Sequence, residues 1–401
     1  MLARIRNLLV LGWVVATPAA AQSGKVSVDH PSAGRTISFY PYKGRWHGAD
    51  VAYSIQLSPD RFLWLFGDTF VGSPNTQRIP GDSMPRNSIG IAECLSGQPC
   101  PLTFAWISHR DGPPSSFFET GTPEYYWPLD GFVSNDTLYV VLQKMHTAGD
   151  GGAFGFDYSG VVLASIKNYM DPPTVWNIVY QPILSGNTVI PGVATVSPAA
   201  AESSADPSAP GGYAYFFTWV KNGRLPEVAL MRLPSTSLDD AALSAGHWQY
   251  LTKSGAWSSW TTPALLPKDA KIMVRGNYTE FTVFYHPELR RWLMTLPGGF
   301  LDGAALLSHA DSLAGNWSAP DSIYNYPESQ PTNPDHAPNV FCYAAKEHPE
   351  LEGKGTFTFT YACNSMKEAE ILANPRLYHP VVVNLPVSTL VGPPKSNLRQ
   401  Q

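Results

Sequence analysis

Two aspartates stand at the two ends of a short hydrophobic hairpin that the sequence predicts between residues 50 and 68. The run VAYSIQL follows Asp50 directly, and the run FLWLFG ends just before Asp68. If the turn is centred near Pro59, the two aspartates are opposite each other, with Cβ atoms about 4.5–5.5 Å apart. Like charges this close raise the pKa of one carboxyl group. Such a pair stabilises a fold poorly, but it can place a proton donor beside a base.

Two further acids occupy corresponding places in later strands. Asp130 in PLDGFVS and Glu280 in YTEFTVF stand at or just inside the start of a strand, as Asp50 does in GADVAYS. An aspartate next to glycine is often only a turn former, which is the alternative for Asp68 and Asp130. Because the positions recur along the chain, all four acids are catalytic candidates.

Aromatic and polar residues gather beside these acids. Rings pack on the C–H faces of sugars, while acids and amides bind sugar hydroxyls, so such a mixture is typical of a carbohydrate site. The alternative for any single ring is ordinary packing between strands. The candidate substrate-binding residues are Trp46, His47, Tyr126, Trp127, Arg275 and Asn277.

The elements that must position these residues are β-strands. Strand-like runs alternate with turn signals along most of the chain, among them DTLYVVLQKM, GVVLASI, GYAYFFTWV and GTFTFTYA. The chain has 15% charged residues, 33 Gly and 37 Pro, which favours an all-β protein. SLDDAALSAG and KEAEILA are candidates for short helical turns.

The strands recur in units of about 75 residues, each with about four strands, which is typical of a β-propeller. Trp176, Trp248 and Trp317 close successive units. We therefore predict a five-bladed propeller, with a pair of β-sandwiches as the alternative. The first strand of each blade lines the central channel, so the acids would converge on one mouth. Residues 198–212 are predicted to be a low-complexity loop and not a domain linker.

The N-terminus and the cysteines both predict export. Residues 1–21 combine Arg4 and Arg6 with an apolar run and small residues, which indicates a signal peptide, with a retained anchor as the alternative. The mature chain, 22–401, is then one domain, secreted or periplasmic. An oxidising compartment favours the disulfides Cys94–Cys100 and Cys342–Cys363 over free buried thiols.

Charge and motifs exclude several other classes of function. A net charge of −5 without a basic cluster gives no reason to expect nucleic acid or an anionic membrane as partner. The sequence contains no Walker loop, HExxH, GxSxG or usable dinucleotide motif. We expect no metal and no cofactor in the chemistry, a polysaccharide as partner, and a monomer.

Four stretches resemble glycoside hydrolase family 183, secreted bacterial proteins long labelled as domain of unknown function 4185. They are GADVAYSIQL with LWLFGDTFVG, YYWPLDGFV with LYVVL, TEFTVFYHPELRRWLM, and YAAKEHPEL with FTFTYACNS. The resemblance runs from about residue 35 to residue 390 and is most specific in the first hairpin. It implies an endo-D-arabinanase that cleaves internal D-arabinofuranosyl linkages, as in mycobacterial arabinogalactan and lipoarabinomannan.

The resemblance also implies roles for the acids. The proposed catalytic carboxylates of the family correspond to Asp50 and Asp68, whereas Asp130 and Glu280 are similar to acids that other propeller furanosidases take from further blades. A close hairpin pair favours retention of anomeric configuration, and a partner across the channel, Glu280, favours inversion. The alternatives are an exo-acting furanosidase, another propeller glycosidase, or a sugar-binding propeller without catalysis.

Overall fold

The computed structural model describes nine segments of the chain. They are residues 35–41, 44–74, 76–94, 99–109, 112–149, 155–221, 225–261, 266–299 and 303–390. The predicted signal peptide, residues 1–21, lies outside the described residues. In the described part, no helix is long and apolar enough to cross a membrane.

The described chain forms five antiparallel sheets in sequence order, and each sheet is one blade. Within a blade, strands that are neighbours in the chain pair with each other. Blade 1 contains β1 (Trp46–Ser58), β2 (Arg61–Val71), β3 (Ser88–Glu93) and β4 (Leu102–Ala105). Blade 2 contains β5 (Tyr125–Ser134), β6 (Thr137–Thr147), β7 (Phe156–Ile166) and β8 (Ile178–Ser185). Blade 3 contains β9 (Val189–Val196), β10 (Tyr213–Val220), β11 (Glu227–Pro234), β12 (Gln249–Leu251) and β13 (Trp257–Ser259), with β14 (Ile272–Arg275) also paired to β11. Blade 4 contains β15 (Thr282–His286), β16 (Arg291–Pro297), β17 (Ala304–Ala310) and β18 (Asp321–Asn325), and blade 5 contains β19 (Val340–Glu347), β20 (Thr356–Ser365) and β21 (Val381–Pro386).

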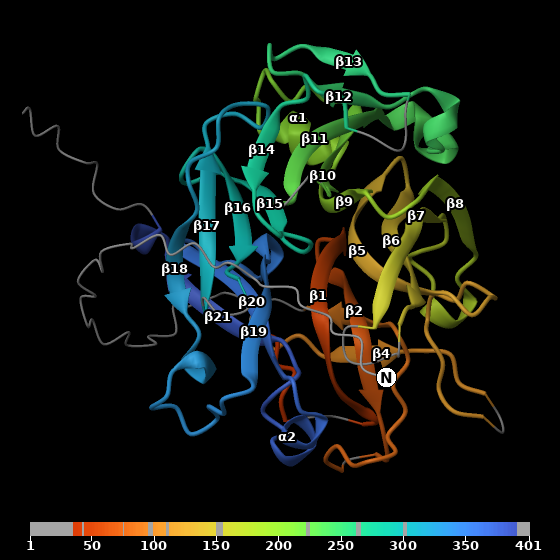
Figure 1. Cartoon of the computed structure of the whole chain (residues 1–401), viewed down its shortest axis with the longest axis vertical. Coiled ribbons are helices and arrows are strands. Elements are labelled where there is room, and N and C mark those ends of the chain that lie inside the picture. Colours follow the sequence, from red (N-terminus) through yellow and green to blue (C-terminus); the bar gives the residue numbers. More distant parts are fainter. Residues whose placement is uncertain are drawn as a thin grey trace, which may run out of the picture. The chain divides into compact units, whose positions relative to one another are not determined.

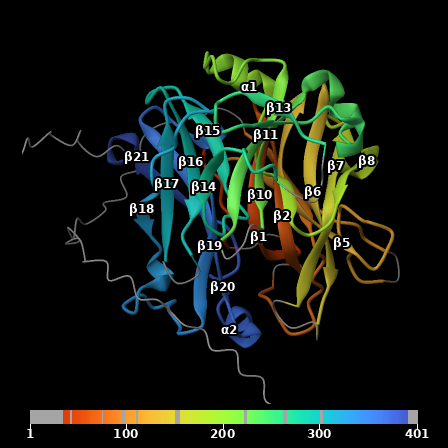
Figure 2. The ribbon, with the colours of Figure 1, turned by 45° about the horizontal axis from the view of Figure 1, so that its top comes forward.

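The first strands of the five blades form a closed ring. Strand β1 contacts β5, β5 contacts β9, β9 contacts β15, β15 contacts β19, and β19 returns to β1. Figures 1 and 2 show the blades following one another around these inner strands in the order of the chain. The predicted all-β, five-bladed propeller is therefore confirmed.

Helices are few and short among the described residues. The α-helices are α1 (Pro198–Ser203) and α2 (Glu368–Ala373), and the 3-10 turns are η1 (Pro173–Val175), η2 (Ser235–Asp240), η3 (Leu243–Ala245), η4 (Pro327–Ser329), η5 (Pro349–Leu351) and η6 (Val387–Thr389). The two stretches predicted as helical turns correspond to η2 with η3 and to α2. The predicted loop 198–212 differs in part, because it begins with helix α1, but it lies between β9 and β10 of one blade and is no linker.

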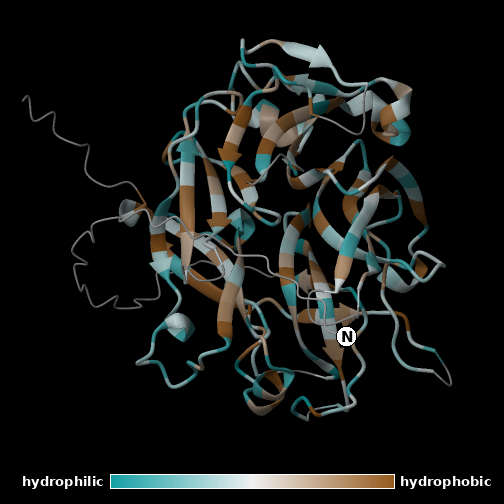
Figure 3. Ribbon diagram, viewed as in Figure 1, coloured by the Kyte–Doolittle hydropathy of each residue, from teal (hydrophilic) through white to brown (hydrophobic). Residues whose placement is uncertain are grey.

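The core lies within and between the blades. Strands such as β6 carry almost continuous buried positions, because both faces of an inner blade strand pack against neighbouring blades. Figure 3 shows the hydrophobic residues concentrated along the strands and the hydrophilic ones at the turns. Of the tryptophans that close the repeat, Trp248 is fully buried, and all three lie just before an outer strand of their blade.

Both predicted disulfides are present. Cys94 is bonded to Cys100, and Cys342 is bonded to Cys363. The second bond joins two residues that are directly paired across β19 and β20. These bonds are consistent with an oxidising compartment such as the periplasm or the extracellular space.

Candidate active site

Four of the five inner strands carry a β-bulge at the level of the candidate acids. In β1 and β2, Ala49 pairs with Thr69 and Val51 with Phe66, so Gly67 and Asp68 together face Asp50. In β19, Ala344 and Ala345 together face one residue of β20. Similar irregularities lie at residues 129–130 of β5 and residues 192–193 of β9. Bulges re-aim side chains and are common beside active sites.

The backbone at these bulges is in an unusual conformation. Val51 has φ of 69°, Ala52 of 59° and Ala344 of 61°, all in the left-handed region. This region is costly for residues other than glycine, most of all for a β-branched valine, by about 1–3 kcal/mol each. Side chains three positions apart point to opposite faces of a regular strand. The extra residue of the β19 bulge lets Tyr343 and Lys346 face the same side and approach the same acids.

Asp50 is the most strongly perturbed acid in contact with the site. Its side chain is partly exposed and packs over the backbone of Gly67, where an added Cβ would clash with Asp50 Oδ1. The Tyr343 hydroxyl donates a hydrogen bond to Asp50 Oδ2 over 2.6 Å. Burial first, and then the charges of Asp68 and Glu280, raise the pKa of Asp50 to about 8. The Asp50 carboxyl group is therefore protonated at neutral pH.

Asp68 is held by two donors from blades 1 and 2. Trp127 Nε1 donates to Asp68 Oδ1 over 3.0 Å, and Arg86 donates to Asp68 Oδ2 over 3.2 Å. Burial raises the pKa of Asp68, while Arg86 and the Trp127 hydrogen bond act in the opposite direction. The expected rise in the pKa of one aspartate is confirmed for Asp50, whose pKa is raised by the Asp68 charge as well as by burial. The prediction that Asp50 and Asp68 form a directly opposed pair is wrong, because Gly67 and Asp68 together face Asp50 at the bulge.

Glu280 comes from blade 4, two residues before β15. Its side chain is 24% exposed, and Glu280 Oε2 accepts a hydrogen bond from Lys346 Nζ over 2.8 Å. Lys346 lies in β19 and is fully buried, with its ammonium nitrogen 4.5 Å from the centre of the Tyr53 ring. Burial lowers the pKa of Lys346, and the charges of Glu280, Asp50 and Asp130 oppose that effect.

Asp130 lies deeper than the other three acids, with 3% of its surface exposed. Its Oδ1 accepts from the Gly131 backbone N–H over 2.7 Å, and its Oδ2 accepts from the Thr195 N–H over 2.7 Å. Burial raises the pKa of Asp130 to about 7, although these backbone hydrogen bonds oppose the increase. Both oxygens are engaged, so this geometry favours a role in joining blades 2 and 3 and does not support direct contact with a substrate.

We refer to Asp50, Asp68, Asp130 and Glu280 as the acid cluster. Two cations, Arg86 and Lys346, compensate it in the described part of the chain. Four carboxylates cannot all be ionised beside two cations in a partly buried site, which agrees with the raised pKa values of Asp50 and Asp130. Protonated and ionised carboxyl groups side by side are the arrangement that acid–base catalysis requires.

Three of the predicted substrate-binding residues have buried rings, which does not support direct contact with a substrate. Trp46, 1% exposed, stacks on Phe104 with ring centres 4.2 Å apart. Tyr126 is 6% exposed and stacks on Tyr180. His47 is fully buried, and its ring nitrogens contact Asp82 and the Ser73 carbonyl at 2.9 and 3.0 Å.

The other three predicted residues are partly or fully exposed. Trp127 lies at the acid cluster, and its partly exposed ring packs edge-on against Tyr125 and Phe156. Arg275 is 68% exposed and pairs with Glu227. Asn277 is exposed, on the segment between β14 and Glu280. Substrate binding by these three stays a prediction.

Sequence reasoning missed Lys346, Tyr343, Arg86 and Tyr53. The Tyr53 hydroxyl donates to the Val193 carbonyl over 2.7 Å and accepts from the Phe281 N–H over 3.3 Å, so it links blades 1, 3 and 4 beside the cluster. Lys346 could have been found, because it is a lysine that directly follows the apolar run VFCYAA. Arg86 lies in the connection between β2 and β3, where no local pattern marks it.

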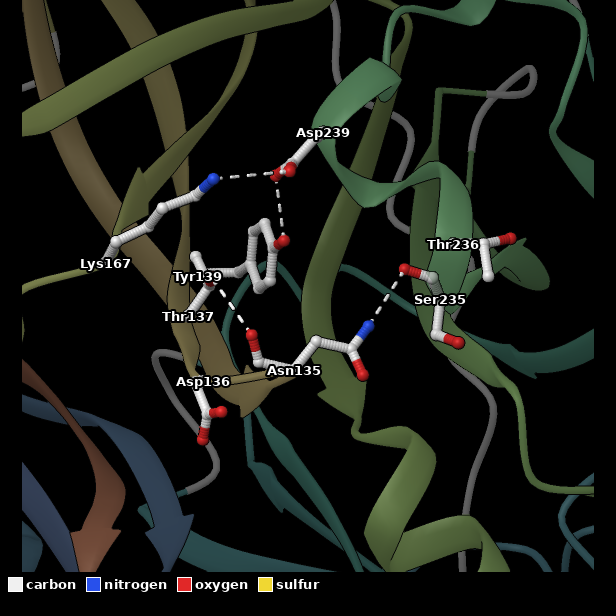
Figure 4. Close-up of a pocket in the computed structure, with 8 residues that line it drawn as sticks. All are labelled: Asn135, Asp136, Thr137, Tyr139, Lys167, Ser235, Thr236 and Asp239. Carbon is white, nitrogen blue, oxygen red and sulfur yellow. Dashed lines mark hydrogen bonds and ion pairs between the residues drawn. The ribbon is translucent and has the colours of Figure 1, made fainter.

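A separate pocket of about 290 Å³ lies between blades 2 and 3. It is formed at the turn after β5, whereas Trp127 and Asp68 meet near the beginning of that strand. Figure 4 shows Lys167 and Tyr139 pointing toward Asp239, with the Tyr139 hydroxyl 2.9 Å from the carboxylate. The pocket contains no residue of the acid cluster, and Lys167 and Asp239 are largely exposed. It does not extend the candidate site.

Fold and site together define a five-bladed β-propeller with an acid cluster where its inner strands meet. The chain belongs to the family described as "Domain of unknown function (DUF5005)", whose model matches residues 38–386. Membership of glycoside hydrolase family 183, which the sequence resembles, is not confirmed. No curated protein matches the chain.

Solved structures share the fold at low identity. The chain is similar to a candidate hydrolase from Bacteroides ovatus, with a TM-score of 0.62, 15% identity and 86% of each chain covered. A xylan β-1,4-xylosidase from Bacillus halodurans gives a TM-score of 0.46 and 11% identity, covering 82% of this chain and 51% of that one. An exo-β-1,3-galactanase from Phanerochaete chrysosporium gives a TM-score of 0.43 and 12% identity, covering 88% of this chain and 63% of that one. At such identities the similarity shows the propeller fold alone.

Proposed function

We propose that this protein is a glycoside hydrolase that cleaves internal D-arabinofuranosyl linkages of a D-arabinan. One observation carries the proposal: three partly exposed carboxyl groups, Asp50, Asp68 and Glu280, meet at the ring of inner strands. Glycoside hydrolysis requires one protonated and one ionised carboxyl group on either side of the scissile bond. The propeller supplies them from blades 1 and 4.

In this proposal Asp50 is the proton donor. Its raised pKa, about 8, keeps the proton in place at neutral pH, and the hydrogen bond from Tyr343 fixes one of its oxygens. Protonation of the leaving oxygen allows the glycosidic bond to break as positive charge develops on the sugar. Asp68 or Glu280 then serves as the nucleophile or base, and Trp127 offers a ring beside Asp68 for a sugar face.

The choice of D-arabinan rests on the resemblance of the first hairpin, in which Asp50 and Asp68 correspond to the proposed catalytic pair of endo-D-arabinanases. A second source of support is the presence of two disulfides, which suit an enzyme acting outside the cytoplasm on a cell-envelope polysaccharide. The propeller fold is compatible with glycosidase activity but does not select the sugar.

The test is incubation of the purified mature protein with mycobacterial arabinogalactan, with mass analysis of the products. A ladder of pentose oligomers is expected, and Asp50→Asn, which removes the proton donor, should reduce its formation by at least a hundredfold in folded protein. Free pentose alone would replace the endo mode by an exo mode. If a folded protein releases no product, the proposed activity on D-arabinan is refuted.

The pH dependence of the reaction offers an independent check. Because Asp50 must carry its proton, activity should fall as pH rises through about 8, the pKa of that group. A rate that stays constant up to pH 10 would assign proton donation to another group.

A further inference from the structure

Lys346 is a charged side chain in a place where a fold alone does not need one. It lies in β19, the inner strand of blade 5, and is fully buried beside the acid cluster. Apart from Glu280, its ammonium group donates over 3.4 Å to the Ala344 carbonyl and faces the Tyr53 ring. Removing an ammonium group from water costs several kcal/mol, and apolar replacements of buried ion pairs are often as stable or more stable. This cost indicates a role beyond packing.

The backbone is shaped to bring Lys346 to this place. The bulge at residues 344–345, with Ala344 in the left-handed region, displaces the alternation of β19 so that Tyr343 and Lys346 both face the acid cluster. From there the ammonium charge acts on Glu280 of blade 4, Asp50 of blade 1 and Asp130 of blade 2. One side chain thus couples acids from three blades.

The hydrogen bonds distinguish Glu280 from Asp68. Asp68 uses one oxygen for Trp127 and the other for Arg86. Glu280, within the described residues, uses Oε2 for Lys346, and the hydrogen bonds of the structure leave Oε1 available. A general base needs a free oxygen to accept the proton of a water molecule.

We propose that Lys346 is a positioning residue of this site: its buried ammonium group holds the Glu280 carboxylate in the acid cluster, so that Glu280, and not Asp68, activates the attacking water. This inference rests on the proposed function. Asp50 gives its proton to the leaving oxygen as the bond from the anomeric carbon to that oxygen breaks. The water oxygen bonds to the anomeric carbon while Glu280 takes one water proton, which returns through solvent to Asp50. One water is consumed, and the configuration at the anomeric carbon is inverted.

Two substitutions test the role of the charge. Lys346→Met keeps the length of the side chain and removes the ammonium group, whereas Lys346→Arg keeps the charge. In Lys346→Met we expect kcat to fall more than tenfold and KM to change less than threefold. The alkaline limit of the pH–rate profile should move upward by about one pH unit, because the Lys346 charge lowers the pKa of Asp50. Lys346→Arg should keep the alkaline limit of the wild type.

A purely structural lysine would give a different pattern. Lys346→Met would then lower the melting temperature and leave the alkaline limit where it is in the wild type, which would overturn the inference. Product configuration, followed by proton NMR at early times, is the second criterion. Inversion supports Glu280 as the base, and retention would restore Asp68 as a nucleophile and refute our assignment.

A readout without substrate separates this inference from the proposed function. The carboxylic acid band of Asp50, identified by its loss in Asp50→Asn, can be titrated by infrared difference spectroscopy in wild type and Lys346→Met. A rise of about one unit in the pKa of Asp50 supports the coupling even if D-arabinan is not cleaved, in which case only the substrate is refuted. An unchanged titration refutes the inference whether or not hydrolysis is observed. If Lys346→Met does not fold, Lys346→Gln provides the same comparison.

Discussion

Replacing Asp50 by asparagine should stabilise the protein, by an amount that depends on pH. Asp50 has a pKa of about 8 in the folded chain and a reference value of 3.8. Because the folded pKa is raised, the stability contributed by this group is complete below the unfolded pKa and is lost as pH rises toward 8. Asparagine resembles the protonated acid, can still accept the Tyr343 hydrogen bond, and does not titrate.

The size of the effect follows from the two pKa values. A pH of 7 lies about 3.2 units above the pKa of the unfolded aspartate. At about 1.36 kcal/mol per unit, keeping Asp50 protonated in the folded state costs the wild type about 4 kcal/mol of stability. Asp50 is partly exposed and water screens part of this cost, so we expect the variant to gain about 2 kcal/mol at pH 7. Near pH 4 the gain should be close to zero.

The assay is urea unfolding of both proteins at pH 4.5, 6 and 7.5, with the disulfides intact. A matched control is Asp321→Asn, since Asp321 is exposed on β18, away from the acid cluster. The reasoning is refuted if Asp50→Asn destabilises the protein equally at all three pH values, or if its gain does not increase with pH. A stabilised and inactive variant would be expected of a residue kept for function at the expense of stability.

Three other changes test the framework around the site. Arg78 is buried and donates to the carbonyls of His47, Ile371 and Leu377 at 2.9, 2.9 and 2.7 Å, so it ties blade 1 to the β20–β21 connection of blade 5. Arg78→Ala should therefore lower the free energy of unfolding by about 3 kcal/mol in urea titrations, and a loss below 1 kcal/mol would contradict this role. Asp130→Asn should destabilise by about 1–3 kcal/mol, because an amide NH₂ would face the N–H of Gly131 or Thr195. A neutral result in the same titrations would mean that these hydrogen bonds do not hold the carboxylate. Burial raises the pKa of Glu352 to about 8 against a reference of 4.5, so its contribution to stability is lost as pH rises between these values. Glu352→Gln should accordingly flatten the decline of the melting temperature between pH 5 and 8, and an unchanged slope would exclude Glu352 as its source.

The propeller could be predicted because its signals are local. Alternation of apolar residues and turn signals recur along the chain, tryptophans close three of the units, and each of these signals reflects a strand or a hairpin of one blade. Convergence of Asp50, Asp68 and Glu280 followed from the same reasoning, since residues at one end of the inner strands must meet.

The sequence did not predict in the same way which side chains of the inner strands point toward the acids and which point into the core. Trp46 and Asp50 are four residues apart and would share a face in a regular strand, but β1 carries an extra residue between Trp46 and Ala49. The tryptophan ring consequently turns into the core of blade 1. Tyr126 and Trp127 are adjacent, so only one of the two rings can point to the acids.

The sequence by itself determined the all-β architecture, the number of blades, the two disulfides and the identity of three acids at the site. The tertiary structure alone decided which side chains surround them, because a β-bulge depends on the pairing partner and not on local composition. Lys346 and Tyr343 reach the acids across blade boundaries, over separations of 66 and 293 residues, and Arg86 reaches Asp68 from the connection between β2 and β3. Burial, which raises the pKa of Asp50, is likewise a property of the closed ring: it exists only when five blades that are distant in sequence exclude water together.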